Sequence, residues 1–313
     1  MRFFNKAKKT ESWLSFALHA DGIAAARIAR VAGARPAVET CVFYPGNPGA
    51  ELLEKAAREL RAATFHCTTI LSGGEYQMLA VEAPNVPADE LKTAVRWRLK
   101  DMIDFHVDDA TIDVLDIPVD KNATVRTSHG MFAIAARNSV VEKRQNLFVA
   151  AKVGLSVIDI PEMAQRNISA LIEPEGRGLA MLSFGADGGL LTVTFNGELY
   201  LSRRIDVTLE QLLDSDHDRK HACFDKITLE LQRSLDHFDR QFHFISVSKL
   251  VLAPTAATGL EEYLSSNLYT PVQTMDLSDA LDISGVPELM GKAQQQRFFF
   301  VIGAALRHEE TLL

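Results

Sequence analysis

The order of strands and helices constrains the fold of this chain more than any other feature of the sequence. Three short apolar stretches separated by hairpin turns span residues 12 to 45, and an amphipathic helix follows over residues 47 to 64. The same order recurs in the second half, where three apolar stretches over residues 180 to 204 precede a helix over residues 225 to 242. Because no short sequence repeat accompanies it, the recurrence predicts an α/β protein with two lobes that are structural relatives at most.

A second pattern lies between these two groups. Residues 77 to 160 read as strand, helix, strand, strand, helix and strand, which predicts a small α/β subdomain inserted in the first lobe. Residues 208 to 226 are polar and are expected to be mobile. The predicted division is a flexible basic tail (1–10), a first lobe (11–76 and 161–176), the inserted subdomain (77–160) and a second lobe (177–313).

Composition excludes several classes of protein. The formal net charge of −8 argues against a general nucleic-acid binder, which needs a basic face. Cys41, Cys67 and Cys223 are far apart and form no CxxC pair, which favours reduced thiols in a cytoplasmic protein. The longest apolar run, residues 298–306, is about half of the roughly 20 residues that a bilayer requires, and the start has no signal-peptide core.

One turn raises the question of a phosphate site. Gly185, Gly188 and Gly189 gather after a strand, where glycines bring backbone N–H groups close to a phosphate in many proteins. The alternative is that they shape a tight turn with positive φ, as Asn196-Gly197 does in the next hairpin. The histidines form no HExxH motif and no serine elbow is present, so no other catalytic motif is identified.

The helix that follows Pro87 carries an aromatic residue outside its apolar face. Trp97 points away from that face, so the sequence leaves two alternatives, burial against a neighbouring lobe or exposure as a contact residue. The apolar face gathers within about 80° of the helical wheel and consists of Leu91, Val95, Leu99 and Met102.

Several strings, in their order and spacing, resemble PilM and its MshI branch, the actin-like proteins of type IV pilus assembly. They include "DELKTAVRWRLKDMIDFHVDDATIDVLDIP", "MLSFGADGGLLTVTFNGELYLSRRIDV" and "LELQRSLDHFDRQF", and the resemblance covers residues 11 to 306. It implies an actin-like (ribonuclease-H-like) fold of two lobes with an inserted small α/β subdomain. The stretch 208–226 is shorter than in the family, which implies a reduced outer subdomain in the second lobe. "DGIAAARI" favours the MshI branch and therefore an MSHA-like pilus.

The resemblance also implies three nucleotide loops, and each departs from the family's pattern. In the first, an acid directly precedes glycine where the family has D-x-G; in the second, a hydroxyl replaces the acid; in the third, proline stands in a glycine-rich turn. The matching positions are Asp21 and Gly22, then Ser183 and Gly185, then Pro254 and Thr255.

These departures imply a degenerate pocket, with no catalysis and with no metal or cofactor expected. Mg²⁺ in such sites relies on one or two carboxylates together with phosphate oxygens, and the second loop lacks its carboxylate. The alternative is a PilM-type protein that binds ATP with Mg²⁺ and whose partner binding is gated by the nucleotide. In it Asp187, Gly188 and Gly189 hold a phosphate and hydrolysis is slow or absent.

In the family, the cleft between the first lobe and the insert receives the cytoplasmic N-terminal tail of a PilN-like inner-membrane protein. The resemblance implies a cytoplasmic adaptor at the inner face of the bacterial inner membrane, with the assembly motor ATPase as a further partner. Helix geometry points to Arg96, Trp97 and Lys100 as partner-binding candidates. The related cytoplasmic part of a type II secretion platform is an alternative, against which the end "RHEETLL" without a transmembrane helix argues.

Overall fold

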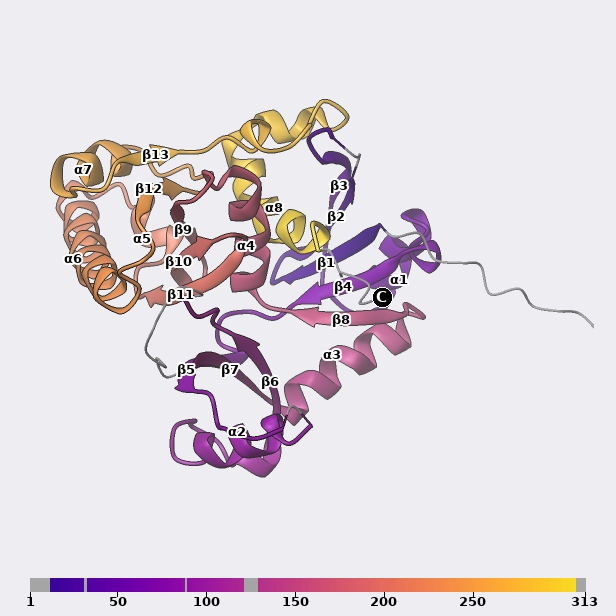
Figure 1. Cartoon of the computed structure of the whole chain (residues 1–313). Coiled ribbons are helices and arrows are strands. Elements are labelled where there is room, and N and C mark those ends of the chain that lie inside the picture. The colour runs from indigo at the N-terminus through magenta and orange to yellow at the C-terminus, as the bar shows by residue number, and fades with distance from the viewer. Residues whose placement is uncertain (1–11, 31–32, 88, 121–128, 308–313) are drawn as a thin grey trace, which may run out of the picture.

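The computed structural model describes residues 12–30, 33–87, 89–120 and 129–307, so the expected basic tail at 1–10 lies outside the described residues. Two five-stranded sheets lie on either side of a central pair of helices, and a three-stranded sheet lies below them in Figure 1. Within the described ranges, no helix has both the length and the apolar character needed to cross a bilayer.

The first sheet has the strand order β3-β2-β1-β4-β8. Its first three strands form the antiparallel meander expected from the sequence, while β4 and β8 run parallel to β1. The elements of this lobe are β1 (Trp13–His19), β2 (Gly22–Ala29), β3 (Ala37–Pro45), α1 (Ala50–Glu59), β4 (His66–Ile70), α3 (Asn138–Ala150), β8 (Leu155–Asp159) and α4 (Pro161–Ile172).

The second sheet repeats this arrangement with the order β11-β10-β9-β12-β13. A meander again forms first, and β12 and β13 run parallel to β9. The turn Asn196-Gly197 has φ of 52° and 73°, as the hairpin signal predicts. The elements are β9 (Gly178–Gly185), β10 (Gly188–Phe195), β11 (Glu198–Ile205), α5 (Leu209–Leu212), α6 (His217–Gln241), β12 (Val247–Leu252), α7 (Leu260–Asn267), β13 (Val272–Thr274) and α8 (Lys292–Ala305).

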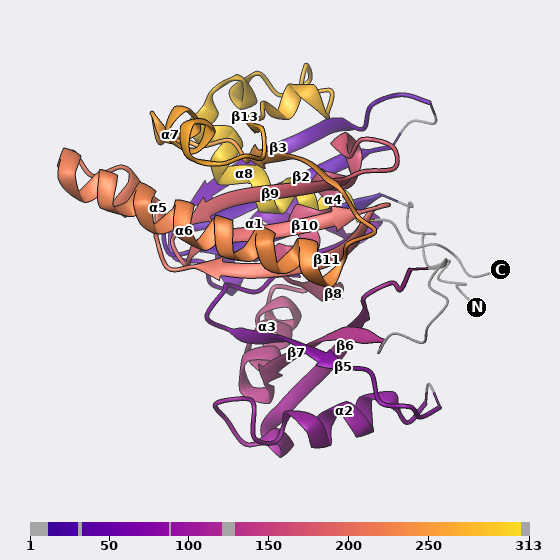
Figure 2. The same ribbon diagram turned by 60° about the vertical axis from the view of Figure 1, so that its left-hand side comes forward.

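Helices cover both faces of each large sheet, which explains why β1, β2, β9 and β10 are buried over most of their length. α4 and α8 pack against each other and fill the space between the two sheets, where α8 covers β1 and β2 and α4 covers β10. α1 and α3 cover the outer face of the first sheet. α6 crosses the outer face of the second, as Figure 2 shows.

The insert is a sheet of order β5-β7-β6 with one helix, and its elements are β5 (Tyr76–Glu82), α2 (Leu91–Leu99), β6 (Ala110–Asp116) and β7 (Gly130–Arg137). Side chains alternate along β7. Ala133 and Ala135 face Val95 and Leu99 of α2, whereas Phe132 on the opposite face contributes to the core of the second lobe. Met102, expected on the apolar face of the helix, lies beyond its end and is 49% exposed.

The last strand of the expected insert lies elsewhere. β8 pairs in parallel with β4 in the first sheet rather than with the insert sheet. Parallel neighbours need a crossover, and α3 supplies it, as α7 does between β12 and β13 in the second lobe. The insert sheet is therefore β5 to β7, and α3 with β8 completes the first lobe.

The expected mobile stretch 208–226 is also corrected. α6 begins at His217, eight residues before the predicted start, because the Asp216 carboxylate accepts hydrogen bonds from the backbone N–H groups of Asp218 and Arg219 (3.0 and 3.1 Å). Before it, α5 is fixed by a capping box between Thr208 and Gln211.

Candidate functional site

The first of the three loops is the turn between β1 and β2. His19 pairs with Gly22, so the two turn residues are Ala20 and Asp21. The exposed Asp21 carboxylate accepts a hydrogen bond from Arg297 of α8 (3.0 Å). The Arg297 guanidinium stacks over the Phe43 ring at 4.1 Å. A cation of the protein itself thus neutralises this carboxylate.

Gly22 has a packing reason to be glycine. A Cβ at this position would lie 2.2 Å from the Tyr44 carbonyl oxygen and 2.6 Å from the Phe43 ring. Its lack of a side chain therefore lets β2 pass close to β3, independently of any phosphate.

The second loop is the turn between β9 and β10, where Gly185 pairs with Gly188. Gly188 has φ of 105°, and a Cβ there would lie 2.7 Å from the Ile205 carbonyl oxygen. Gly185 does not have positive φ and has open space around it. Close packing therefore explains Gly188 but not Gly185. Asp187 in the turn is exposed and accepts a hydrogen bond from the Gly73 backbone N–H (2.8 Å).

Ser183 faces the protein interior. Its hydroxyl donates to the Gln165 side-chain oxygen on α4, and both residues are buried. The Gln165 amide donates in turn to the Met181 carbonyl and the Thr192 hydroxyl, both at 2.9 Å. The Ser183 hydroxyl is thus part of a satisfied buried network.

The third loop follows β12. Pro254 and Thr255 are buried, and the Thr255 hydroxyl accepts from the Ala257 N–H (3.1 Å). The Gln296 side chain of α8 accepts from the Ala256 N–H (3.1 Å) and donates to the Phe184 carbonyl (3.4 Å). Gln296 therefore joins the third loop to the second.

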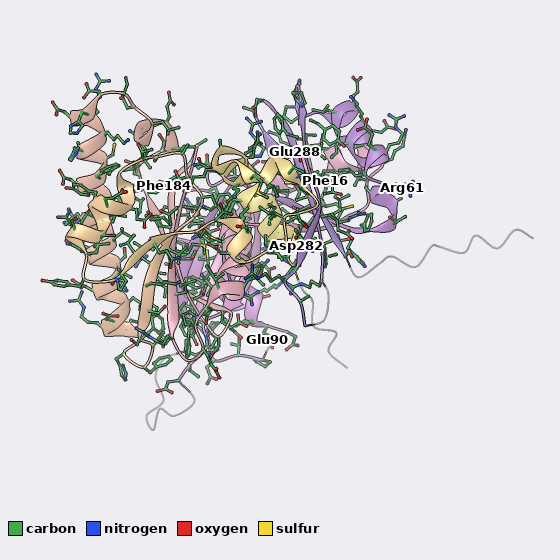
Figure 3. All side chains as sticks on the ribbon, turned by 90° about the horizontal axis from the view of Figure 1, so that it is seen from above. Phe16, Arg61, Glu90, Phe184, Asp282 and Glu288 are labelled. Carbon is green, nitrogen blue, oxygen red and sulfur yellow. The ribbon has the colours of Figure 1, made fainter. Side chains whose placement is uncertain are left out.

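α8 connects all three loops through adjacent residues, Gln296 and Arg297. In Figure 3, Phe16 of the first sheet and Phe184 of the second lie on either side of the yellow C-terminal segment that contains α8. Mg²⁺ at the first loop would have to share the Asp21 carboxylate with the Arg297 guanidinium, which is bound to one of its oxygens. In the described part of the chain, no cluster of three or more His, Cys, Asp or Glu side chains is arranged to hold a metal ion.

A buried polar contact joins both lobes and the insert. Tyr76, the first residue of β5, donates its hydroxyl proton to Glu162 of α4 and accepts from Arg204 of β11. Arg204 also bonds to Glu162 at 2.8 Å, and the Glu162 side chain is 1% exposed. Burial, together with the neighbouring Glu162 charge, raises the pKa of Tyr76 well above its usual value, so its hydroxyl remains a donor.

Of the three predicted partner residues, Arg96 and Trp97 lie on α2 and Lys100 directly follows its end. Trp97 is 68% exposed, so burial between subdomains does not occur, and Lys100 is exposed as well. Arg96 instead donates to the carbonyls of Val107 and Ala110 (2.6 and 3.1 Å) and holds the start of β6.

A groove of about 700 Å³ lies between the insert and the first lobe, and none of Arg96, Trp97 and Lys100 lines it. It lies on the face of β7 that carries Ile134, opposite the face that packs on α2. β8 is the outermost strand of its sheet, so among the described strands none pairs with its outer edge. The lining comprises Leu71, Thr111, Asp113, Ile134, Ala136, Val141, Gln145, Asn146, Phe148, Val149, residues 153 to 158 and Ile160.

Comparison with known proteins places this geometry in a fold class. No family model matches the sequence, and no curated protein matches it. The structure is similar to a chain of the PilM-PilN type IV pilus biogenesis complex, with a TM-score of 0.72 and 19% identity over 95% of this chain and 98% of that chain. The chain has the actin-like ATPase fold, and within that class its fold is PilM-like.

Two further solved structures have lower scores. One is the cytoplasmic domain of EpsL, an inner membrane component of the type II secretion system of Vibrio cholerae (TM-score 0.46, 12% identity, 92% of this chain and 94% of that chain). The other is a protein with actin-like ATPase fold and unknown function from Bacteroides thetaiotaomicron (0.48, 11%, 93% and 99%).

The sequence did not identify the partners of these loops. Arg297 and Gln296 lie in an apolar helix more than 100 residues from Asp21 and Phe184, and nothing local links them. Glu162 and Gln165 could have been found from the sequence. They precede the buried Ile168 at steps of three residues, so the helical pattern places these polar side chains toward the buried side of α4.

Proposed function

We propose that this protein is a non-catalytic scaffold of type IV pilus assembly that binds the cytoplasmic tail of a PilN-like inner-membrane protein. The observation that carries the proposal is the groove of about 700 Å³ between α3, β8 and the insert sheet, in a fold similar to the PilM-PilN complex. We further propose an MSHA-like system, as in the MshI branch, with the protein held at the inner face of the inner membrane by its partners and the motor ATPase as a second partner.

The groove has the chemistry that an extended peptide needs. Val149 on its rim is 73% exposed, and Val141, Val157 and Ile158 provide apolar contacts along its length. The outer edge of β8 offers backbone groups at the same place. Peptides that bind at sheet edges gain affinity from main-chain hydrogen bonds and specificity from pockets for alternate side chains.

The proposal that the scaffold holds no nucleotide has separate support. The Asp21 carboxylate is paired with Arg297, Ser183 is bound to Gln165, and Pro254 stands in the third loop. A scaffold of this kind would transmit the state of its partners through its surfaces, without hydrolysis.

A peptide titration tests the groove. A fluorescent synthetic peptide of the N-terminal tail of the PilN-like protein from the same organism is titrated with the full chain, and binding is followed by anisotropy. We expect saturable binding, and we expect Val149→Glu to weaken it by at least about tenfold (about 1.4 kcal/mol), because a charge then replaces an apolar contact.

Leu229→Glu is the matched control. Leu229 on α6 is 46% exposed and does not line the groove, so this variant should bind as the parent does. Absence of binding by the parent, or equal losses in both variants, contradicts the proposal.

A further inference from the structure

The six residues Leu71–Tyr76, which we call the connecting segment, join β4 to β5 and touch the groove. Leu71 lines the groove, and its backbone N–H donates to the Asp159 carbonyl at the end of β8 (2.9 Å). The Glu75 carboxylate accepts two hydrogen bonds from Arg144 of α3 (3.1 and 2.8 Å). Arg144 is buried and also donates to the Ile70 carbonyl (2.7 Å). Two residues of the connecting segment are thus fixed to the groove wall.

Two other residues of the connecting segment are fixed to the second lobe. The Gly73 N–H donates to Asp187 in the turn between β9 and β10. Tyr76 accepts a hydrogen bond from Arg204 of β11 in the second lobe, and it also donates to Glu162 of α4 in the first lobe. Contacts to the two sides therefore alternate along six residues, and the connecting segment has little free length with which to absorb a displacement on one side.

Gly73 is the residue at which the connecting segment passes closest to the second lobe. A Cβ there would lie 2.8 Å from the Arg204 guanidinium and 3.1 Å from the Asp187 Cβ, whereas a Cβ at Gly74 would meet nothing within 4 Å. Neither glycine has positive φ, so alanine is compatible with the backbone at both positions. The connecting segment therefore packs against the second lobe at Gly73 and not at the adjacent Gly74, which makes the two glycines a matched pair for a test.

We propose that the connecting segment couples the groove to the second lobe, so that the position of the Asp187 turn and of Arg204 regulates what the groove binds. This regulation rests on the peptide-binding function proposed above. Because a coupling free energy is reciprocal, a peptide in the groove must also bias the contacts of Gly73 and Tyr76 with the second lobe.

Hydrogen exchange on the free protein tests the coupling without any ligand. We expect Gly73→Ala to displace the connecting segment from the Arg204 guanidinium and the Asp187 turn, and to speed amide exchange at least about threefold in α3 and β8. Gly74→Ala, the matched control, should leave exchange there unchanged. Parent-like exchange in Gly73→Ala, or equal acceleration in both variants, overturns the proposal.

A second pair of variants tests the coupling independently, in case Gly73→Ala does not fold. Asp187→Ala removes an exposed acceptor of a hydrogen bond from the connecting segment. Asp21→Ala removes an acceptor, also exposed, in the turn between β1 and β2, where it bonds to Arg297 rather than to the connecting segment. Acceleration in α3 and β8 is expected in Asp187→Ala alone; equal exchange in these two variants contradicts the coupling.

The peptide titration separates the two proposals. If the parent binds the tail peptide, Gly73→Ala should change the affinity by about fivefold or more, the lower range of known couplings, and Gly74→Ala should not. An unchanged affinity in Gly73→Ala overturns the coupling alone. A parent that binds no tail peptide overturns the proposed function, and the exchange experiment still decides whether the connecting segment couples the two lobes.

Discussion

His19 ends β1 beside the ring of Phe43, at 6.4 Å between centroids, and its Nε2 is buried without a hydrogen-bond partner. Burial lowers the pKa of this imidazole; Asp21 raises it and Arg297 lowers it. The folded pKa therefore lies below the unfolded value of about 6.5. Between the two values the unfolded chain binds more protons than the folded one, so stability is highest above pH 6.5 and falls as the pH drops below it.

The pH dependence of unfolding tests this assignment. The free energy of unfolding, measured with urea at pH 7.5 and pH 5.5, should fall on acidification, and His19→Gln should lose less between the two pH values than the parent does. Equal losses in the parent and in His19→Gln would show that His19 does not titrate in this way.

Other single residues show where a sequence interpretation reaches its limit. The departures at Asp21, Ser183 and Pro254 are visible in the sequence, but their meaning depends on partners that only the fold brings near. From the sequence, Ser183 is interpreted as the loss of a metal ligand. In the structure, its hydroxyl donates a hydrogen bond to Gln165. Gly188 has the sequence pattern of a phosphate loop, yet the structure requires glycine there for packing, because a Cβ would lie 2.7 Å from the Ile205 carbonyl oxygen.

At the scale of elements, periodicity predicted the two meanders and α1 well, because their apolar patterns are local. Periodicity failed where pairing between strands far apart in the sequence decides to which sheet a strand belongs. β8 follows the insert in the sequence but belongs with β4, since the parallel pair and its crossover helix must close the first sheet. Periodicity also missed the first turns of α6. Residues His217–Lys220 are polar and give no apolar pattern, and the helix starts there because the Asp216 side chain caps it.

The cap of α6 gives a prediction at this scale. Asp216→Ala removes the acceptor of two backbone N–H groups and should lower the free energy of unfolding by about 1 kcal/mol. Asp239→Ala, in the exposed part of the same helix, should change it by less than about 0.5 kcal/mol. Urea denaturation of both variants measures the difference, and equal effects would mean that the cap does not hold the first turn.

For the whole molecule, the central question is what holds the two lobes together. The resemblance implies that in related proteins a nucleotide lies between them. In this structure two groups of side chains join the lobes: Gln296 and Arg297 link the three loops, and Arg204 reaches Glu162 and Tyr76 across the lobes. The sequence predicted the two lobes because each carries its own strand order. It could not predict these contacts, because they join residues from different lobes.

Nucleotide binding is the corresponding test. We expect a fluorescent ATP analogue, titrated from micromolar to millimolar concentration with and without Mg²⁺, to show no saturable binding, because Asp21 is paired and Ser183 is buried. Thermal unfolding gives an independent readout, since a ligand at 100 times its Kd stabilises the folded state by about 2.7 kcal/mol. Mg²⁺-dependent saturation with a matching rise in Tm would favour the alternative in which Asp187 and Gly188 hold a phosphate. Asp187→Ala would then be the informative variant, because alanine at Gly188 would disturb the close contact with β11 whether or not a nucleotide binds.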